Sequence, residues 1–226
     1  KRPVILVCAE KFSDKVGNVR TSRMLFGDGA AAMVIAPAPA GSVSDIDIVQ
    51  TYASGPQKEV NAIVWPNPDF DNHITVYGPP VRALAQRYLI QMLDELRSMP
   101  GLYGSDKMID EIDLVVPHQA NKTMVTELAV EAGLSPEQLY FNIERVGNTS
   151  AASIPLAIHD AVMEGVIDKP MRIFAPGFGA GAVGGYAVIR IDPVIVTTPK
   201  PVALEETPLF PSDTSTLEDV RVGFGE

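Results

Sequence analysis

Short continuous apolar runs and longer runs with helical spacing alternate along this chain of 226 residues. The runs at 4–9 and 30–36 are rich in β-branched or small apolar residues, which is typical of strands covered on both faces. Five further short strands are predicted at 46–53, 73–77, 112–116, 171–176 and 186–191. These strands alternate with helical patterns, so the chain is predicted to belong to the α/β class, with sheets packed between helices.

Three segments have helical patterns. From Val81 to Leu96 apolar residues recur every three or four positions, and Pro80 suits a first helical turn. A second helix is predicted from Asn121 to a C-terminal cap at Gly133. A third is predicted over 150–163.

Two segments have the composition of irregular structure. The stretch 54–72 is predicted to be a loop, because prolines interrupt it at positions 56, 66 and 68. Residues 193–226 carry five prolines, six acidic residues and two basic ones, which predicts an extended acidic tail. An alternative is that this tail wraps over a partner subunit, with Leu209, Phe210 and Phe224 as anchors.

The net charge, the lengths of the apolar runs and the cysteine count argue against several classes of protein. The net charge of −10, with scattered basic residues, argues against a nucleic-acid or anionic-membrane surface. No apolar run approaches the roughly 20 residues that span a bilayer, and residues 1–11 lack a signal-peptide pattern. The single cysteine excludes an internal disulfide framework and favours a reducing, cytoplasmic compartment. Because the chain begins directly in a predicted strand, we expect that another segment or subunit precedes it.

The three histidines differ in their surroundings. None has metal-ligand spacing to another ligand residue, so no metal site is expected. His73 in a polar loop and His159 within a helix are interpreted as structural or surface residues. His118 lies between a buried strand and a helix, where open α/β sheets gather reactive groups. From these surroundings alone a catalytic and a structural role for His118 are equally open.

Three other features invite a functional interpretation. Asn148 stands in a run of small and polar residues, where a turn or helix cap is the ordinary role. Cys8 lies in an apolar strand without a nearby cation or helix N-terminus, which argues against a reactive thiol. Residues 179–184 spell a dinucleotide-binding fingerprint, but a strand follows them instead of a helix. They are therefore interpreted as a glycine-rich turn between two strands.

Three segments together resemble the ketoacyl-ACP synthase III branch of the thiolase-fold condensing enzymes. They are LFGDGAAAMVI at 25–35, VVPHQAN at 115–121 and RVGNTSAASIPLAI at 145–158. The resemblance implies the C-terminal half of a thiolase-like α/β fold, with a mixed five-stranded sheet layered with helices. It places a single domain at 1–192, with 1–36 completing the N-terminal half-fold, and leaves 193–226 as the tail.

The resemblance also assigns site residues. His118 and Asn148 match the catalytic histidine and asparagine of a Cys-His-Asn set, and Asn121 matches a neighbour that orders water. Arg20, Gly78 and Phe178 fall where the family binds coenzyme A or pantetheine, or places an aromatic loop beside the pocket. The family's nucleophilic cysteine lies upstream of the matched region, and Cys8 aligns with a structural position. Thr123 replaces an arginine that many members use to bind the carrier.

The function implied by the resemblance is decarboxylative Claisen condensation of an acyl thioester with malonyl-ACP or malonyl-CoA, in fatty-acid or polyketide biosynthesis. No permanently bound cofactor is expected, since coenzyme A or the phosphopantetheine of acyl carrier protein carries the substrates. The expected partners are acyl carrier protein and an N-terminal half bearing the cysteine, either a separate subunit or the other piece of a nicked chain. A homodimer or heterotetramer of thiolase-fold units is expected. Alternatives are an acyltransferase or thioester hydrolase on the same fold, and a non-catalytic partner subunit.

Overall fold

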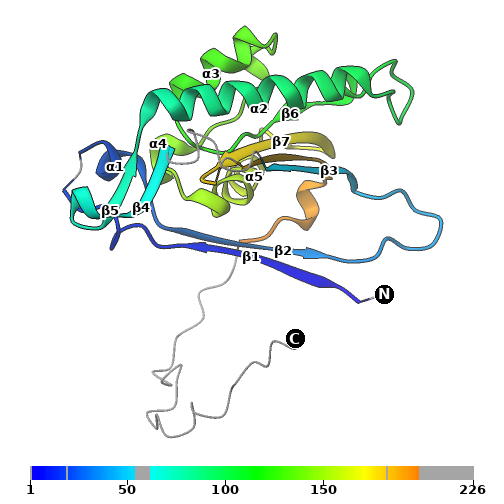
Figure 1. Cartoon of the computed structure of the whole chain (residues 1–226). Helices are drawn as coiled ribbons and strands as arrows, with labels where there is room; N and C mark the ends of the chain where they lie inside the picture. The colour runs from blue at the N-terminus through cyan, green and yellow to red at the C-terminus, as the bar shows by residue number, and fades with distance from the viewer. Residues whose placement is uncertain (1, 19, 54–61, 182, 199–226) are drawn as a thin grey trace, which may run out of the picture.

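A four-stranded mixed sheet forms the centre of the computed structural model, which describes residues 2–18, 20–53, 62–181 and 183–198 (Figure 1). Strands β3 and β7 pair antiparallel with β8, and the short β6 pairs parallel with β7. The order across the sheet is β3 (Ile46–Ala53), β8 (Val183–Ile191), β7 (Met171–Gly179) and β6 (Leu114–Val115). The sheet in these residues therefore has one strand fewer than the five predicted.

Helices cover both faces of this sheet (Figure 1). On one face, α2 (Gly78–Ser98) and α3 (Lys122–Glu131) enclose a core in which Leu93 packs with Phe174 and Val188. On the other, α5 (Ser153–Met163) encloses a second core around Ala157, Ile173 and Ile189. The predicted layering of helices on a sheet is thus confirmed.

A separate antiparallel ribbon lies on the far side of α5. It consists of β1 (Val4–Glu10) and β2 (Gly29–Ile35), paired from Val4 opposite Ile35 to Glu10 opposite Gly29. Both strands were predicted to be covered on both faces, and for this chain alone that prediction is wrong. Val7 is 64% exposed and Val34 is 70% exposed, because a single layer packs against only part of the ribbon.

A second small sheet occupies part of the predicted loop 54–72. Strand β4 (Ile63–Asn67) pairs with β5 (His73–Val76), and the 3-10 turn η2 (Pro68–Phe70) joins them. The register shifts between Val64 and Asn67, where Pro66 has no N–H for a ladder bond. This pairing corrects the loop prediction, since 63–67 is a strand, and it gives the predicted strand at 73 its partner.

The helix ends follow the predicted signals. Asn121 caps α3 by accepting a hydrogen bond from the Met124 N–H at 2.9 Å, and Gly133 follows with φ of +87°. The helix predicted over 150–163 is divided, because Ser150 adopts φ of +50° and opens a separate 3-10 turn before α5. The remaining elements are α1 (Arg20–Leu25), η3 (Met108–Glu111), η4 (Pro136–Gln138), α4 (Ile143–Val146), η5 (Ser150–Ala152) and η6 (Pro193–Ile195).

Two further expectations concern the chain's extent and surroundings. Most of the predicted tail, 199–226, lies outside the described residues, and so do its proposed anchors. Within the described ranges, none of the helices has the length and apolar character to cross a membrane. The domain limits at 36 and 192 stay predictions.

Candidate active site

A cavity of about 1090 Å³ brings the predicted residues together. Its walls come from the β3–β8 part of the sheet, the β4–β5 sheet, the end of α1, and the starts of α2, α3 and α5. Five of the six predicted site residues line it: Gly78, His118, Asn121, Asn148 and Phe178. The side chain of the sixth, Arg20, lies outside the described parts of the structure.

His118 is held at the end of β6 by backbone and side-chain contacts. Its N–H donates to the Pro176 carbonyl on β7 at 2.8 Å, which extends the parallel pairing of the two strands. Its ring nitrogen Nδ1 lies 2.6 Å from the Ser153 hydroxyl oxygen. Within the described residues Nε2 has no hydrogen-bond partner, so it is the ring nitrogen left for a molecule in the cavity.

Burial determines the charge of His118. Desolvation lowers the pKa of the imidazole to about 4, because the protein atoms packed around the ring stabilise its charged form less than water does. The imidazole is therefore neutral near pH 7 and carries one N–H. A neutral imidazole donates a hydrogen bond from one nitrogen and accepts at the other.

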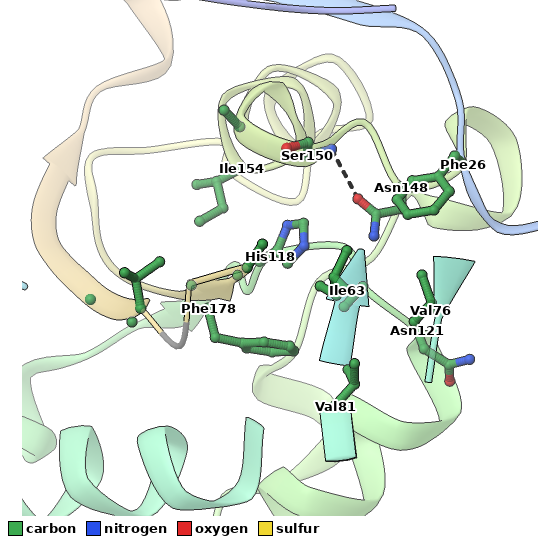
Figure 2. A pocket seen from close by; sticks show the side chains of 18 of the residues that line it. Phe26, Ile63, Val76, Val81, His118, Asn121, Asn148, Ser150, Ile154 and Phe178 are labelled. Carbon is green, nitrogen blue, oxygen red and sulfur yellow. Dashed lines mark hydrogen bonds between the residues drawn. The ribbon is translucent and has the colours of Figure 1, made fainter. Parts of the chain in front are cut away.

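Asn148 is positioned by the chain on both sides of it. Its N–H donates to the Leu25 carbonyl at 2.8 Å, and its own carbonyl accepts from Gly27 N–H at 3.1 Å. Its side-chain Oδ1 accepts from the Ser150 N–H at 2.9 Å (Figure 2). This bond assigns the amide orientation and turns the Nδ2 donor toward the space that His118 also faces (Figure 2).

Two glycines permit this close approach of the segments that carry the motifs. A Cβ on Gly27 would lie 2.0 Å from the Val146 carbonyl oxygen, a distance that no side chain tolerates. Gly147 has φ of +71°, which favours glycine, and packs against the Gly27 backbone. Gly27 of the FGDG motif and Gly147 of the GNTS motif therefore let the two segments pack closely, and this packing places Asn148 at the cavity wall.

The other predicted residues occupy different parts of the wall. Phe178 approaches His118 edge-on, with ring centroids 5.7 Å apart and planes at 82°. The Asn121 side-chain oxygen caps α3, and its side chain points away from His118 (Figure 2). Gly78 begins α2 and leaves open space beside its Cα. The roles of these residues toward a carrier stay predictions.

Sequence reasoning gave no specific role to two buried residues that support the site. Gln119 donates from Nε2 to the Pro117 carbonyl at 2.7 Å and accepts from the Asn142 N–H at 3.0 Å. It thereby fixes the segment that carries His118. Ser153, which contacts His118, lies 35 positions away, so only its place in the GNTSAAS motif hinted at a link to the site.

Cys8 lies apart from these groups. It pairs opposite Ala31 in the β1–β2 ribbon and is not among the residues that line the cavity. In the described ranges no three histidine, cysteine, aspartate or glutamate side chains gather in a way that could hold a metal ion.

Two family models match the chain. The model of the 3-oxoacyl-[acyl-carrier-protein (ACP)] synthase III C terminal matches residues 105–191, and that of 3-oxoacyl-[ACP] synthase III matches residues 1–53. The chain belongs to the 3-oxoacyl-ACP synthase III family. This membership confirms the resemblance found in the three motifs.

Individual relatives agree with the family models. The chain is 32% identical over 188 residues to beta-ketoacyl-[acyl-carrier-protein] synthase III of Aquifex aeolicus, covering 83% of this chain and 57% of that protein. The structure matches 3-oxoacyl-(acyl carrier protein) synthase III of Pseudomonas aeruginosa with a TM-score of 0.72 and 27% identity, covering 84% of this chain and 58% of that one.

A third relative comes from polyketide synthesis. The priming beta-ketosynthase from the R1128 polyketide biosynthetic pathway matches with a TM-score of 0.72 and 26% identity, covering 85% of this chain and 58% of that one. These structures confirm the thiolase-like α/β fold. The chain spans little more than half the length of the relatives it matches.

Proposed function

We propose that this chain supplies the oxyanion hole of a decarboxylative condensing enzyme. The observation that carries the proposal is that two side-chain nitrogens without a hydrogen-bond partner in the described residues, His118 Nε2 and Asn148 Nδ2, lie at one cavity. Asn148 Oδ1 is occupied by Ser150, which leaves Nδ2 for a ligand, and His118 Nε2 is open to the same space. Two neutral donors that line one cavity suit an oxygen that develops negative charge.

Decarboxylation of a malonyl thioester creates such an oxygen. Loss of carbon dioxide leaves an enolate whose oxygen was the thioester carbonyl oxygen. Hydrogen bonds from His118 and Asn148 stabilise the enolate more than the neutral thioester, and they therefore lower the barrier. The enolate carbon then attacks an acyl thioester, and the thiolate that carried the acyl group leaves.

A cysteine outside the matched region would carry that acyl group. Cys8 is the only cysteine of the chain and does not line the cavity. Exposed apolar surface supports an N-terminal half-fold as the partner that brings the cysteine. The β1–β2 ribbon exposes valines and isoleucine, and Val49 on the cavity side of β3 is 64% exposed.

The substrates proposed are an acyl thioester and a malonyl thioester on acyl carrier protein or coenzyme A. The relatives' names refer to acyl carrier protein and, in one case, to polyketide priming, which supports fatty-acid or polyketide synthesis. An acyltransferase or hydrolase would require His118 as a general base. The lowered pKa of His118 makes it a weak base, which disfavours that alternative.

The central test uses the completed enzyme, meaning this chain together with the polypeptide that supplies the other half. Asn148→Ala and His118→Ala are each expected to slow release of carbon dioxide from malonyl thioester by about 100- to 1000-fold. His159→Ala, on the outer part of α5, serves as the matched control and is expected to retain the rate. Unchanged decarboxylation in either site variant would remove the oxyanion-hole role.

A second test concerns the nucleophile. This chain alone, incubated with an acyl-CoA, is expected to show no added acyl mass by intact-mass spectrometry. The completed enzyme is expected to gain one acyl group, and peptide mapping would place it outside this chain. A stable acyl adduct on Cys8 would contradict the assignment.

A further inference from the structure

A buried serine contacts the nitrogen of His118 that faces away from the cavity. Ser153 is the first residue of α5 and is fully buried. Its Oγ lies 2.6 Å from His118 Nδ1, and it accepts a longer bond of 3.4 Å from the Gln119 N–H. In the part of the chain that the structure describes, these are the hydrogen-bond partners of the hydroxyl.

The partners of the hydroxyl decide which way the short bond runs. The Gln119 N–H can only donate, so Oγ accepts from it. If His118 Nδ1 also carried a hydrogen, both neighbours of Ser153 Oγ would be donors. The hydrogen of the buried hydroxyl would then have no acceptor. Buried donors are almost always paired in proteins. The arrangement that satisfies all three groups has the Ser153 hydroxyl donating to an unprotonated Nδ1.

We propose that Ser153 is a positioning residue that sets the tautomer of His118, placing its single hydrogen on Nε2 toward the cavity. The opposite tautomer would present a lone pair at Nε2 and repel an enolate oxygen. The tautomer is a property of the folded chain and does not depend on the proposed function. Only its effect on catalysis rests on the proposed function.

Two features of the surroundings act in the same direction. Ser153 stands at the N-terminus of α5, whose dipole disfavours a positive charge on the adjacent imidazole. Burial likewise keeps the imidazole neutral. With a neutral ring, a hydrogen bond received at Nδ1 is enough to fix the remaining proton on Nε2.

The direct test is nitrogen NMR of the full chain labelled with ¹⁵N-histidine, with His118 assigned from the spectrum of His118→Asn. Wild type is expected to show an unprotonated Nδ1 and a protonated Nε2. Ser153→Ala is expected to lose this preference, giving shifts averaged between the tautomers or reversed. Ser153→Thr keeps the hydroxyl and is expected to restore the wild-type pattern.

Two results would overturn the proposal. One is a protonated Nδ1 in the wild type, and the other is an unchanged tautomer in Ser153→Ala. Thermal unfolding of each variant verifies that it is folded before its spectrum is read. If Ser153→Thr does not fold because its methyl group does not fit, the alanine variant still decides the question.

The kinetic test uses the completed enzyme. Ser153→Ala is expected to lower kcat for malonyl decarboxylation by about 10- to 100-fold, the range known for loss of the partner that orients a metal-binding histidine, with little change in KM. A raised KM with unchanged kcat would point to a merely structural role and contradict the proposal. If the wild-type enzyme did not decarboxylate malonyl thioester, the proposed function would fail while the NMR result on the tautomer would stand.

Discussion

His118 and Asn148 acquire their proposed chemistry from what their other atoms are bound to. The Ser150 N–H occupies Asn148 Oδ1, and the Ser153 hydroxyl lies against His118 Nδ1. Each residue therefore presents its remaining nitrogen to the cavity. Exchanging the donor for an acceptor, without changing the shape of the side chain, tests this directly.

Asn148→Asp is such an exchange. The carboxylate retains an oxygen that can accept from Ser150, but it places a second, negatively charged oxygen where Nδ2 stood. Because that oxygen repels the developing enolate, decarboxylation by the completed enzyme is expected to fall at least as far as in Asn148→Ala. Carbon dioxide release measures the effect. A rate in Asn148→Asp above that in Asn148→Ala would mean that the donor at this position is unimportant.

The lowered pKa of His118 predicts a dependence of stability on pH. With a pKa of about 4 in the folded chain and an ordinary value near 6.5 when unfolded, the unfolded state binds more protons between these limits. The stabilisation is therefore complete above pH 6.5 and is lost as the pH falls toward 4. Over this pH range the free energy of unfolding falls by up to about 3 kcal/mol, at roughly 1.4 kcal/mol for each pKa unit.

Urea unfolding at a series of pH values from 7 to 4 measures how much His118 contributes to this loss of unfolding free energy. Wild type is expected to lose more unfolding free energy over that range than His118→Gln, which has no titrating group at the position. Equal losses in the two proteins would show that burial does not disfavour the charged ring.

At the scale of residues, the sequence pointed to the two proposed reactive side chains but not to the residues that support them. His118 and Asn148 stood out once the three motifs were taken together. The Ser153 contact depends on how α5 packs beside the end of β6, a tertiary relation that local patterns do not encode. The capping of α3 by Asn121 was predictable, since it involves neighbours three positions apart.

At the scale of elements, the site depends on contact between the FGDG turn before β2 and the GNTS turn before α5. Leu25 and Gly27 exchange backbone hydrogen bonds with Asn148 across this contact. Because a Cβ on Gly27 would collide with the Val146 carbonyl, any side chain there must separate the two turns.

Gly27→Ala is therefore expected to destabilise the chain by about 2 kcal/mol or more, in the range of core overpacking, and to move Asn148 from the cavity wall. Gly78→Ala is the matched control, since a Cβ there meets no atom within 4 Å and the residue is helical. Gly78→Ala is expected to leave the free energy of unfolding unchanged or to raise it slightly. Chemical unfolding compares them, and equal stabilities would contradict the close contact.

The elements that were predicted correctly are those with strong local signals. The helix from Gly78 has a long apolar stripe, and the glycine-rich turn joins β7 to β8 as expected. Strand β4 was missed because Pro66 interrupts it, and only pairing with β5 reveals a strand with an irregular register. The exposure of β1 was missed for a different reason, since its composition predicts burial that this chain alone does not provide.

For the whole molecule, the apolar ribbon formed by β1 and β2 is the feature that best supports the proposed partner. Among the described residues its two strands pair only with each other, so each has an unpaired edge, and apolar side chains are exposed on both faces. Such surface promotes association of a chain on its own. Helix α3 lies on the opposite side of the central sheet from the ribbon (Figure 1). Its surface carries ion pairs from Arg82 on α2 to Glu127 and Glu131.

Val7→Lys tests whether the ribbon is an assembly surface. In the chain alone it is expected to reduce concentration-dependent self-association in sedimentation velocity and to lower binding of a hydrophobic dye. In the completed enzyme the same charge becomes buried, so the two halves are expected to separate at lower protein concentration. Val130→Lys is the control, because Val130 is 48% exposed on α3, away from the ribbon. Equal behaviour of the two lysine variants in both assays would mean that the ribbon is not where the N-terminal half binds, and the proposed source of the cysteine would then have to contact another face.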